Sequence, residues 1–219
     1  MTCSSSIPLR PDIEDRVRNI IRGDVPWSLR YLNEFFYLKC GPDLFERKLF
    51  PNPKEVTESF GGYNAYRKYL SKKFDPKDES VGLISVGDGN TPRTASIFAF
   101  LTKWKCLSID PQLKEKEWKI SRLSTAKLRI EESKDAIYST LKECNKILIV
   151  CVHSHANLNS TMRIVTNALS RVDLSVISIQ CCVVQEIKDN KPSFEYRDWS
   201  ILSPENLVKV WLDGKRKEA

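Results

Sequence analysis

The sequence has no long apolar run, only two histidines and no paired-cysteine motif, and each of these absences excludes a class of protein. No stretch approaches the roughly 20 apolar residues that a membrane-spanning helix needs, so we expect no membrane span and no membrane partner. Residues 1–10 lack the basic and then apolar pattern of a secretory signal. The seven cysteines include no CxxC pair, which favours reduced thiols in a cytoplasmic or nuclear protein over a disulfide framework.

Several catalytic motifs are missing as well. The chain has no GxSxG nucleophile elbow, no phosphate loop that ends in Gly-Lys-Ser/Thr, and no internal repeat. Its 219 residues, 41% of them hydrophobic, are enough for one domain with a sizeable core. The net charge of +7 permits an anionic partner such as nucleic acid but does not by itself establish one.

The first third of the chain is predicted to be helical. Apolar residues recur at helical spacing in residues 12–22, 27–39 and 59–74, and residues 41–53 form a helical turn closed by prolines. A charged connector follows at residues 75–80. We therefore predict a helical N-terminal segment, residues 1–78, packed on a main domain of residues 79–219.

Strands and helices alternate in the main domain. Apolar strands are predicted at residues 81–87, 105–110, 146–153 and 174–184, with helices over residues 92–104 and 157–171. Residues 194–201 are a candidate fifth strand, and residues 203–212 are either a helix or a turn followed by a strand. A strand near residues 118–123 or 127–130 and a helix over residues 135–144 are also expected. Four cysteines in these apolar runs are interpreted as core residues: Cys106, Cys151, Cys181 and Cys182.

This alternation is typical of an α/β protein with a Rossmann-like, mostly parallel sheet and helices on both faces. Ligands of such folds bind at the carboxyl ends of the strands. The segment LISVGDGNTPRT, residues 83–94, lies at that edge. Gly87 allows a tight turn, and Gly89 lets a ligand approach the backbone. About 20 residues further on, Asp110 ends the next strand, where a carboxylate accepts hydrogen bonds from ribose hydroxyls in nucleoside-binding sheets.

Two features of the turn bear on which nucleoside it holds. Asp88 places a carboxylate between the glycines, which is unfavourable beside a pyrophosphate but favourable beside the sulfonium and ammonium groups of S-adenosylmethionine. Position 92 is proline where the dinucleotide motif has its third glycine. Both features favour the methyl donor over a nicotinamide cofactor.

The segments ISVGDGNTPRTASIFAF and SIDP resemble the first two motifs of the class I, Rossmann-like S-adenosylmethionine-dependent methyltransferases, and the order of elements agrees from Val81 to Val184. The resemblance implies ribose contact by Asp110 and cofactor contact by a loop consisting of Gly87, Asp88, Gly89, Asn90 and Thr91. Two features depart from the family. Ser85 stands where the family usually has an acid, and the Asn-Pro-Pro-Tyr type of motif is absent after the strand at residues 146–153.

The two histidines, His153 and His155, follow that strand, next to the expected cofactor cleft. Spaced by two, they would share one face if the strand continued through them. One interpretation is a polar loop that caps the next helix through Asn157 or Ser160. Another is a catalytic base with an ordinary pKa near 6.5. A third is a metal site completed by Cys151 or Asp88, but nothing in the sequence fixes these ligands, so the histidines are kept as catalytic candidates and no metal site is assigned.

The sequence therefore leaves two main functional hypotheses. The first is methyl transfer from S-adenosylmethionine to an unidentified acceptor, RNA and protein being the two classes considered. The alternative is a non-catalytic binding or scaffold module, which the missing acid at Ser85 favours. An NAD(P)-dependent oxidoreductase is a weaker alternative.

Overall fold

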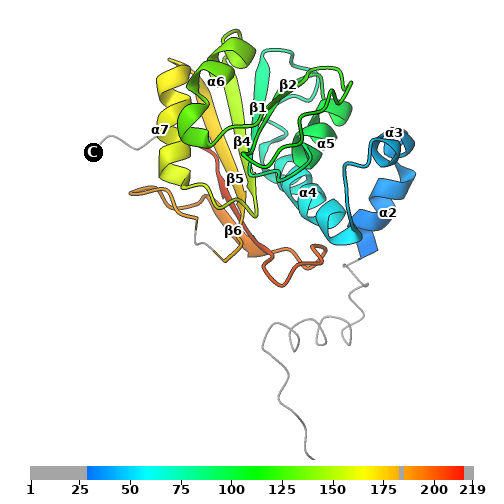
Figure 1. The fold of residues 1–219 in the computed structure, drawn as a ribbon. Helices are drawn as coiled ribbons and strands as arrows, with labels where there is room; N and C mark the ends of the chain where they lie inside the picture. Colours follow the sequence, from blue (N-terminus) through cyan, green and yellow to red (C-terminus); the bar gives the residue numbers. More distant parts are fainter. Residues whose placement is uncertain (1–28, 183–184, 215–219) are drawn as a thin grey trace, which may run out of the picture.

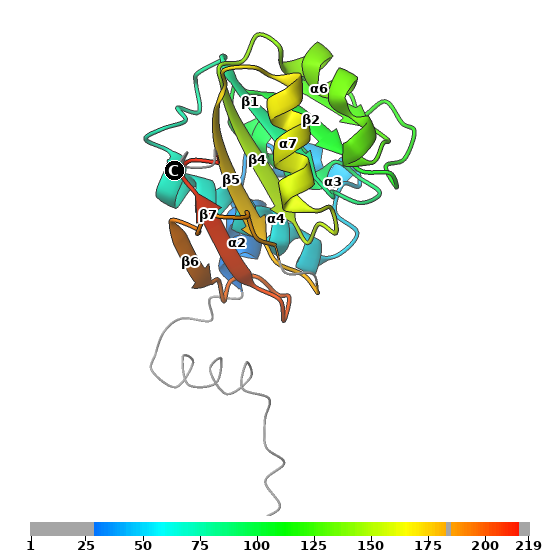
Figure 2. The same ribbon diagram turned by 90° about the vertical axis from the view of Figure 1, so that its left-hand side faces the viewer.

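The computed structural model describes residues 29–182 and 185–214. The helix predicted over residues 12–22 lies outside the described residues. A seven-stranded sheet runs through the molecule with helices on both of its faces (Figures 1 and 2), so the predicted α/β class is confirmed. No helix among the described residues is long and apolar enough to cross a membrane.

The sheet has the strand order β3-β2-β1-β4-β5-β7-β6. Strands β1 to β5 pair in parallel, and β7 runs antiparallel to both β5 and β6. Every residue of β1 is buried, as are all but the first residues of β4 and β5, which is the burial expected of strands covered on both faces. The strands are β1 (Val81–Val86), β2 (Lys105–Ile109), β3 (Leu123–Ala126), β4 (Lys146–Val152), β5 (Asp173–Ile179), β6 (Phe194–Arg197) and β7 (Leu207–Trp211).

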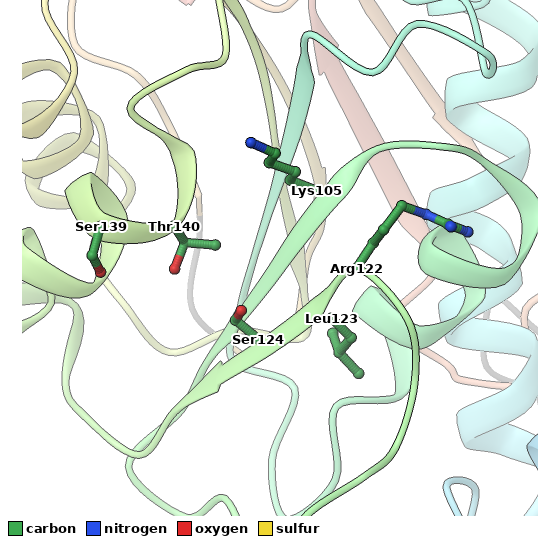
Figure 3. A pocket seen from close by; sticks show the side chains of 6 residues that line it. All are labelled: Lys105, Arg122, Leu123, Ser124, Ser139 and Thr140. Carbon is green, nitrogen blue, oxygen red and sulfur yellow. The ribbon is translucent and has the colours of Figure 1, made fainter.

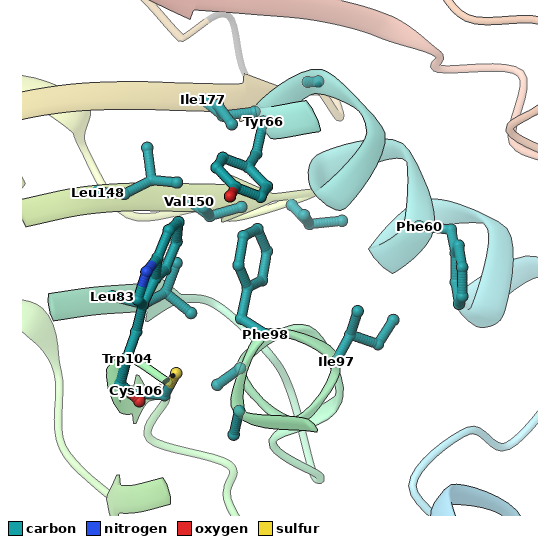
Figure 4. Packing of buried hydrophobic residues seen from close by; sticks show 14 of the residues in the cluster. Phe60, Tyr66, Leu83, Ile97, Phe98, Trp104, Cys106, Leu148, Val150 and Ile177 are labelled. Carbon is teal, nitrogen blue, oxygen red and sulfur yellow. Dashed lines mark hydrogen bonds between the residues drawn. The ribbon is translucent and has the colours of Figure 1, made fainter. Parts of the chain in front are cut away.

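One face of the sheet is covered by α5 (Arg93–Leu101) and by helices from the N-terminal part of the chain. These helices are α2 (Arg30–Tyr37), α3 (Gly41–Glu46), α4 (Pro53–Ala65) and the π-helical turn η2 (Tyr66–Leu70). Figure 4 shows Tyr66, Phe98 and Trp104 packed together over the strands. The ring centroids of Tyr66 and Trp104 lie 4.8 Å apart, so aromatic packing holds these helices on the sheet.

The opposite face is covered by α6 (Lys134–Leu141) and α7 (Leu158–Ala168), with the short 3₁₀ turn η3 (Ile130–Glu132) before α6. In Figure 1 these two helices lie on the other side of the strands from α4 and α5. The sequence prediction of a helix near residues 135–144 is thus confirmed.

One open alternative is decided and two predictions are corrected by the structure. Residues 203–212 form a turn and then β7, the second of the two predicted alternatives, because the β-branched Val208 and Val210 pair with β5 and β6. Strand β3 occupies Leu123–Ala126, between the two ranges that were considered. Strand β5 ends at Ile179, so Cys181 is only half-buried and Cys182 is exposed, whereas Cys106 and Cys151 are core residues as predicted.

The N-terminal helices are tied to the far end of the sheet by a polar contact. The hydroxyl of Tyr31, in α2, donates a hydrogen bond of 2.5 Å to the carboxylate of Asp198, which follows β6. Tyr31 is fully buried and Asp198 is 8% exposed, so neither group has water as an alternative partner.

We expect the Tyr31→Phe variant to lose about 1–3 kcal/mol of unfolding free energy, because one oxygen of the buried Asp198 carboxylate would lose its donor, while the other keeps the N–H of Ser200. The matched control is Tyr37→Phe, since Tyr37 lies in the same helix and is 89% exposed. Urea unfolding of the two variants checks this. Equal stability of both would show that the contact does not hold α2 in place.

Candidate active site at the carboxyl edge of the sheet

The turn between β1 and α5 takes the conformation that its two glycines allow. Gly87 has a φ of +87° and Gly89 a φ of +74°, both in the left-handed region that side chains disfavour. The space beside Gly87 is filled by Ser154, whose Cα would lie 2.9 Å from a Cβ at position 87. The guanidinium of Arg93 lies over Gly89, 3.3 Å from where a Cβ would stand. A side chain at either position would therefore disturb the turn.

Asp88, predicted as a cofactor contact, has its carboxylate turned into the interior. Its oxygens accept hydrogen bonds from the backbone N–H groups of Thr94 (3.1 Å) and Ala95 (3.3 Å), at the start of α5, and from the hydroxyl of Ser108 in β2 (2.7 Å). The residue is 2% exposed. Its carboxylate caps the helix and is not presented to a ligand over the turn, because the helix N–H groups attract it inward.

Asp110 lies beside the glycine turn, as the sequence spacing predicts. One carboxylate oxygen accepts from the N–H of Gly89 at 2.8 Å, and the other accepts from the N–H of Gln112 at 2.7 Å. A carboxylate has about four acceptor positions, so two remain for further donors. The structure thus joins the ends of β1 and β2 into one polar edge.

The other loop residues that were predicted to contact a cofactor make contacts within the chain. Thr91 is buried, and its hydroxyl donates to the backbone oxygen of Leu49 at 2.6 Å. Asn90 is exposed, and its backbone oxygen accepts from the N–H of Lys114 at 3.1 Å. The segment around Leu49, just before α4, therefore lies against the glycine turn.

Sequence reasoning did not find that α4 supplies charged groups to this edge. Glu55 forms an ion pair of 2.7 Å with Arg93, and both side chains are less than one-fifth exposed. Burial, the largest influence, raises the pKa of Glu55, and the nearby Arg93 opposes that effect. No local pattern reveals this pair, because its members come from different helices.

His153 does not stay on the strand. Strand β4 ends at Val152, and His153 has a left-handed φ of +52°, which turns its ring toward α4. Its Nε2 atom lies 3.4 Å from a carboxylate oxygen of the buried Glu58, which also pairs with Lys54 at 2.9 Å. Burial is the main cause that lowers the pKa of His153 to about 4, and the charge of Lys54 lowers it further. The imidazole is therefore neutral at pH 7, and its titration lies well below the value near 6.5 that the sequence suggested.

His155 has a different environment, so the predicted pairing of the two histidines on one face is wrong. Its side chain is exposed, and its Nε2 atom lies 3.6 Å from the Sγ atom of Cys182. The helix that follows is capped by Asn157, whose side chain accepts from the N–H of Ser160 at 2.9 Å. The capping interpretation is thus confirmed for Asn157. Cys151 and Asp88, considered as further metal ligands, are both buried elsewhere.

A separate hollow lies at the opposite edge of the sheet, near the amino ends of β2 and β3 (Figure 3). It is lined by Lys105, Arg122, Leu123, Ser124, Ser139 and Thr140. Because ligands of open α/β sheets bind at the carboxyl ends of the strands, we place the candidate site at the glycine turn instead.

The strand order separates this sheet from the all-parallel dinucleotide-binding order 3-2-1-4-5-6, because the antiparallel β7 lies between β5 and β6. The chain has a Rossmann-like α/β fold in which the antiparallel β7 separates β5 from β6. No family model and no curated protein matches the sequence.

Comparison with solved structures gives distant matches. A mutant of MtNAS in complex with S-adenosylmethionine is 8% identical over 89% of this chain and 74% of that chain, with a TM-score of 0.47. The complex of MtNAS with MTA and tNA is 9% identical, with a TM-score of 0.43. The MycE methyltransferase from the mycinamycin biosynthetic pathway, in complex with Mg and SAH, is 14% identical over 52% of this chain and 33% of that chain, with a TM-score of 0.36. The function therefore has to be argued from the carboxyl-edge residues themselves.

The lowered pKa of His153 makes stability depend on pH. Between pH 7 and pH 5 the unfolded chain protonates this histidine and the folded chain does not, so the free energy of unfolding falls as the pH falls. We expect the wild type to lose about 2 kcal/mol more than His153→Asn over this range. Asparagine is chosen because it tolerates the left-handed backbone.

Urea unfolding at the two pH values checks this, with His155→Asn as the control because His155 is exposed. The control should follow the wild type. If His153→Asn also followed it, His153 would not be a neutral buried group.

Proposed function

We propose that the chain binds S-adenosylmethionine at the carboxyl-edge site and transfers its methyl group. The observation that carries this proposal is the position of Asp88. A pyrophosphate in a dinucleotide site takes hydrogen bonds from the free N–H groups at the start of the helix. Here the Asp88 carboxylate already accepts from two of these groups, so a phosphate would meet a buried negative charge. A phosphate-free nucleoside does not have this conflict, which favours the methyl donor over NAD(P).

The residues at the glycine turn suit the ribose of such a nucleoside. Asp110 lies at the end of β2 and has two acceptor positions beyond those used by Gly89 and Gln112. A side chain at position 87 or 89 would collide with Ser154 or meet Arg93, so these positions require glycine. The long side chain of Arg93 would have to move aside for a ligand to reach the backbone of Gly89 beside Asp110.

The ion pair of Arg93 with Glu55 suits the methionine part of the cofactor. An amino-acid head carries one carboxylate and one ammonium group, and this pair offers one charge of each sign beside Gly89. Arg93 would bind the carboxylate through its planar guanidinium, and Glu55 would bind the ammonium.

Bound S-adenosylmethionine supplies an electrophilic methyl group on its sulfonium. The chain's contribution is mainly to position the reacting groups. His153 is kept as the candidate base because its ring is neutral at pH 7, although a pKa of about 4 makes it a weak base and its Nε2 atom is buried against Glu58. The net charge of +7 favours an anionic macromolecule such as RNA as the methyl acceptor.

One observation favours a second function, a non-catalytic binding module with the same fold. The Nε2 atom of His153 is buried against Glu58, and Ser154 and Arg93 fill the space beside the two glycines. A site that its own side chains close in this way would bind a partner protein without turnover.

Calorimetric titration with S-adenosylhomocysteine distinguishes these functions. We expect the wild type to bind, and Asp110→Asn to bind about 10-fold more weakly, because a hydrogen bond to a charged acceptor contributes about 1.5–3 kcal/mol. The control is Asp173→Asn, since Asp173 lies at the amino end of β5 and is largely exposed.

Absence of binding by the wild type would favour the non-catalytic module. Equal affinity in Asp110→Asn and the control would remove Asp110 from the site. Tighter binding of NAD⁺ than of S-adenosylhomocysteine would contradict the role given to Asp88.

A further inference from the structure

Two loops at the carboxyl edge bring together three side chains that commonly bind metals. His155 comes from the loop between β4 and α7, and Cys181 and Cys182 follow β5. Their ligand atoms all lie within 4.8 Å of one another. The Sγ atoms of the two cysteines are 4.0 Å apart, and the Sγ atom of Cys182 lies 3.6 Å from the Nε2 atom of His155.

The separations of 4.0 Å and 3.6 Å are close to the edges of a tetrahedral zinc site. With Zn–S bonds of about 2.3 Å and Zn–N bonds of about 2.0–2.1 Å, a tetrahedron places two sulfurs about 3.8 Å apart and a sulfur and a nitrogen about 3.6 Å apart. Two of the three ligand pairs are thus near coordinating distances, and the third pair, His155 and Cys181, lies within 4.8 Å and would have to move closer on metal binding.

Hydrogen bonds hold the two loops together independently of a metal. The side-chain amide of Gln185 donates to the backbone oxygens of Ser154 (2.9 Å) and Ala156 (3.1 Å). In the metal-free chain the thiol of Cys181 also donates to the backbone oxygen of Ser154, at 3.7 Å, and this bond is lost when the thiol becomes a thiolate. Because the loops are already ordered, metal binding costs less conformational entropy of the chain.

We propose that His155, Cys181 and Cys182 bind one zinc ion. Two cysteines and one histidine form a three-residue ligand set that leaves the fourth position to water, and the exposure of His155 and Cys182 places that position toward solvent. Binding converts the two thiols to thiolates and releases two protons to the solvent, so the two negative sulfurs balance the charge of Zn²⁺.

The ion would fix the loops that flank the glycine turn. Ser154 directly precedes the ligand His155 in the chain, and its side chain is packed against Gly87. Metal binding would therefore stabilise the position of Ser154 beside the turn. This inference rests on the geometry of the two loops and not on the proposed methyl transfer.

The test is metal titration of the full chain, purified without metal and kept reduced. Co²⁺ is added first, because thiolate coordination gives an intense charge-transfer absorption, and Zn²⁺ should then displace it. We expect one equivalent of metal per chain, release of two protons per Zn²⁺, and at least about 10-fold weaker binding in Cys182→Ser and in His155→Asn.

Cys40→Ser is the matched control, because Cys40 precedes α3 and lies far along the chain from the cluster. It should bind metal as the wild type does. A thermal melt of the metal-free variants shows that they are folded, which is expected because Cys182 and His155 are exposed. Absence of stoichiometric binding at micromolar metal, or unchanged affinity in folded Cys182→Ser, would overturn the proposal.

Discussion

The buried carboxylate of Asp88 determines the shape and the chemistry of the carboxyl edge. It joins three elements, since it caps the start of α5, accepts from Ser108 in β2 and belongs to the turn that ends β1. These bonds fix the glycine turn so that the N–H of Gly89 points to Asp110. The same carboxylate accepts from the helix N–H groups that a dinucleotide fold would offer to its phosphates. One buried charge thus both orders the site and restricts the ligands that suit it.

Parallel-sheet geometry explains which contacts at the carboxyl edge could be predicted from the sequence. The carboxyl ends of adjacent parallel strands meet at one edge, so the positions of Gly87, Gly89 and Asp110 in their strands were enough to place them together. The direction of the Asp88 side chain was not predictable in this way. It depends on the left-handed backbone of the glycines on either side. It also depends on the N–H groups at the start of α5, which lack partners within the helix and donate to the Asp88 carboxylate.

Sequence analysis missed two kinds of feature. These are contacts between segments that are far apart in the sequence, and the residues at which strands end. Glu55 and Glu58 lie at the site because α4 packs beside α5 and β4. The spacing of residues within one segment does not predict such packing. His153 and His155 lie in different environments because β4 ends at Val152, before either histidine, and His153 has a left-handed φ. The apolar run through Cys182 was interpreted as a strand, but β5 ends at Ile179, and this places two thiols near His155 instead of in the core.

The central claim is that the glycine turn holds a phosphate-free nucleoside, and amide NMR of the glycines tests it most directly. The chain has only eight glycines, and Gly41 and Gly214 lie outside the carboxyl-edge site and serve as internal references. With S-adenosylhomocysteine we predict large shifts of the Gly87 and Gly89 amides and none at the references. NAD⁺ should leave all of them unchanged. Shifts at the turn caused by NAD⁺, or a turn unaffected by S-adenosylhomocysteine, would contradict the account.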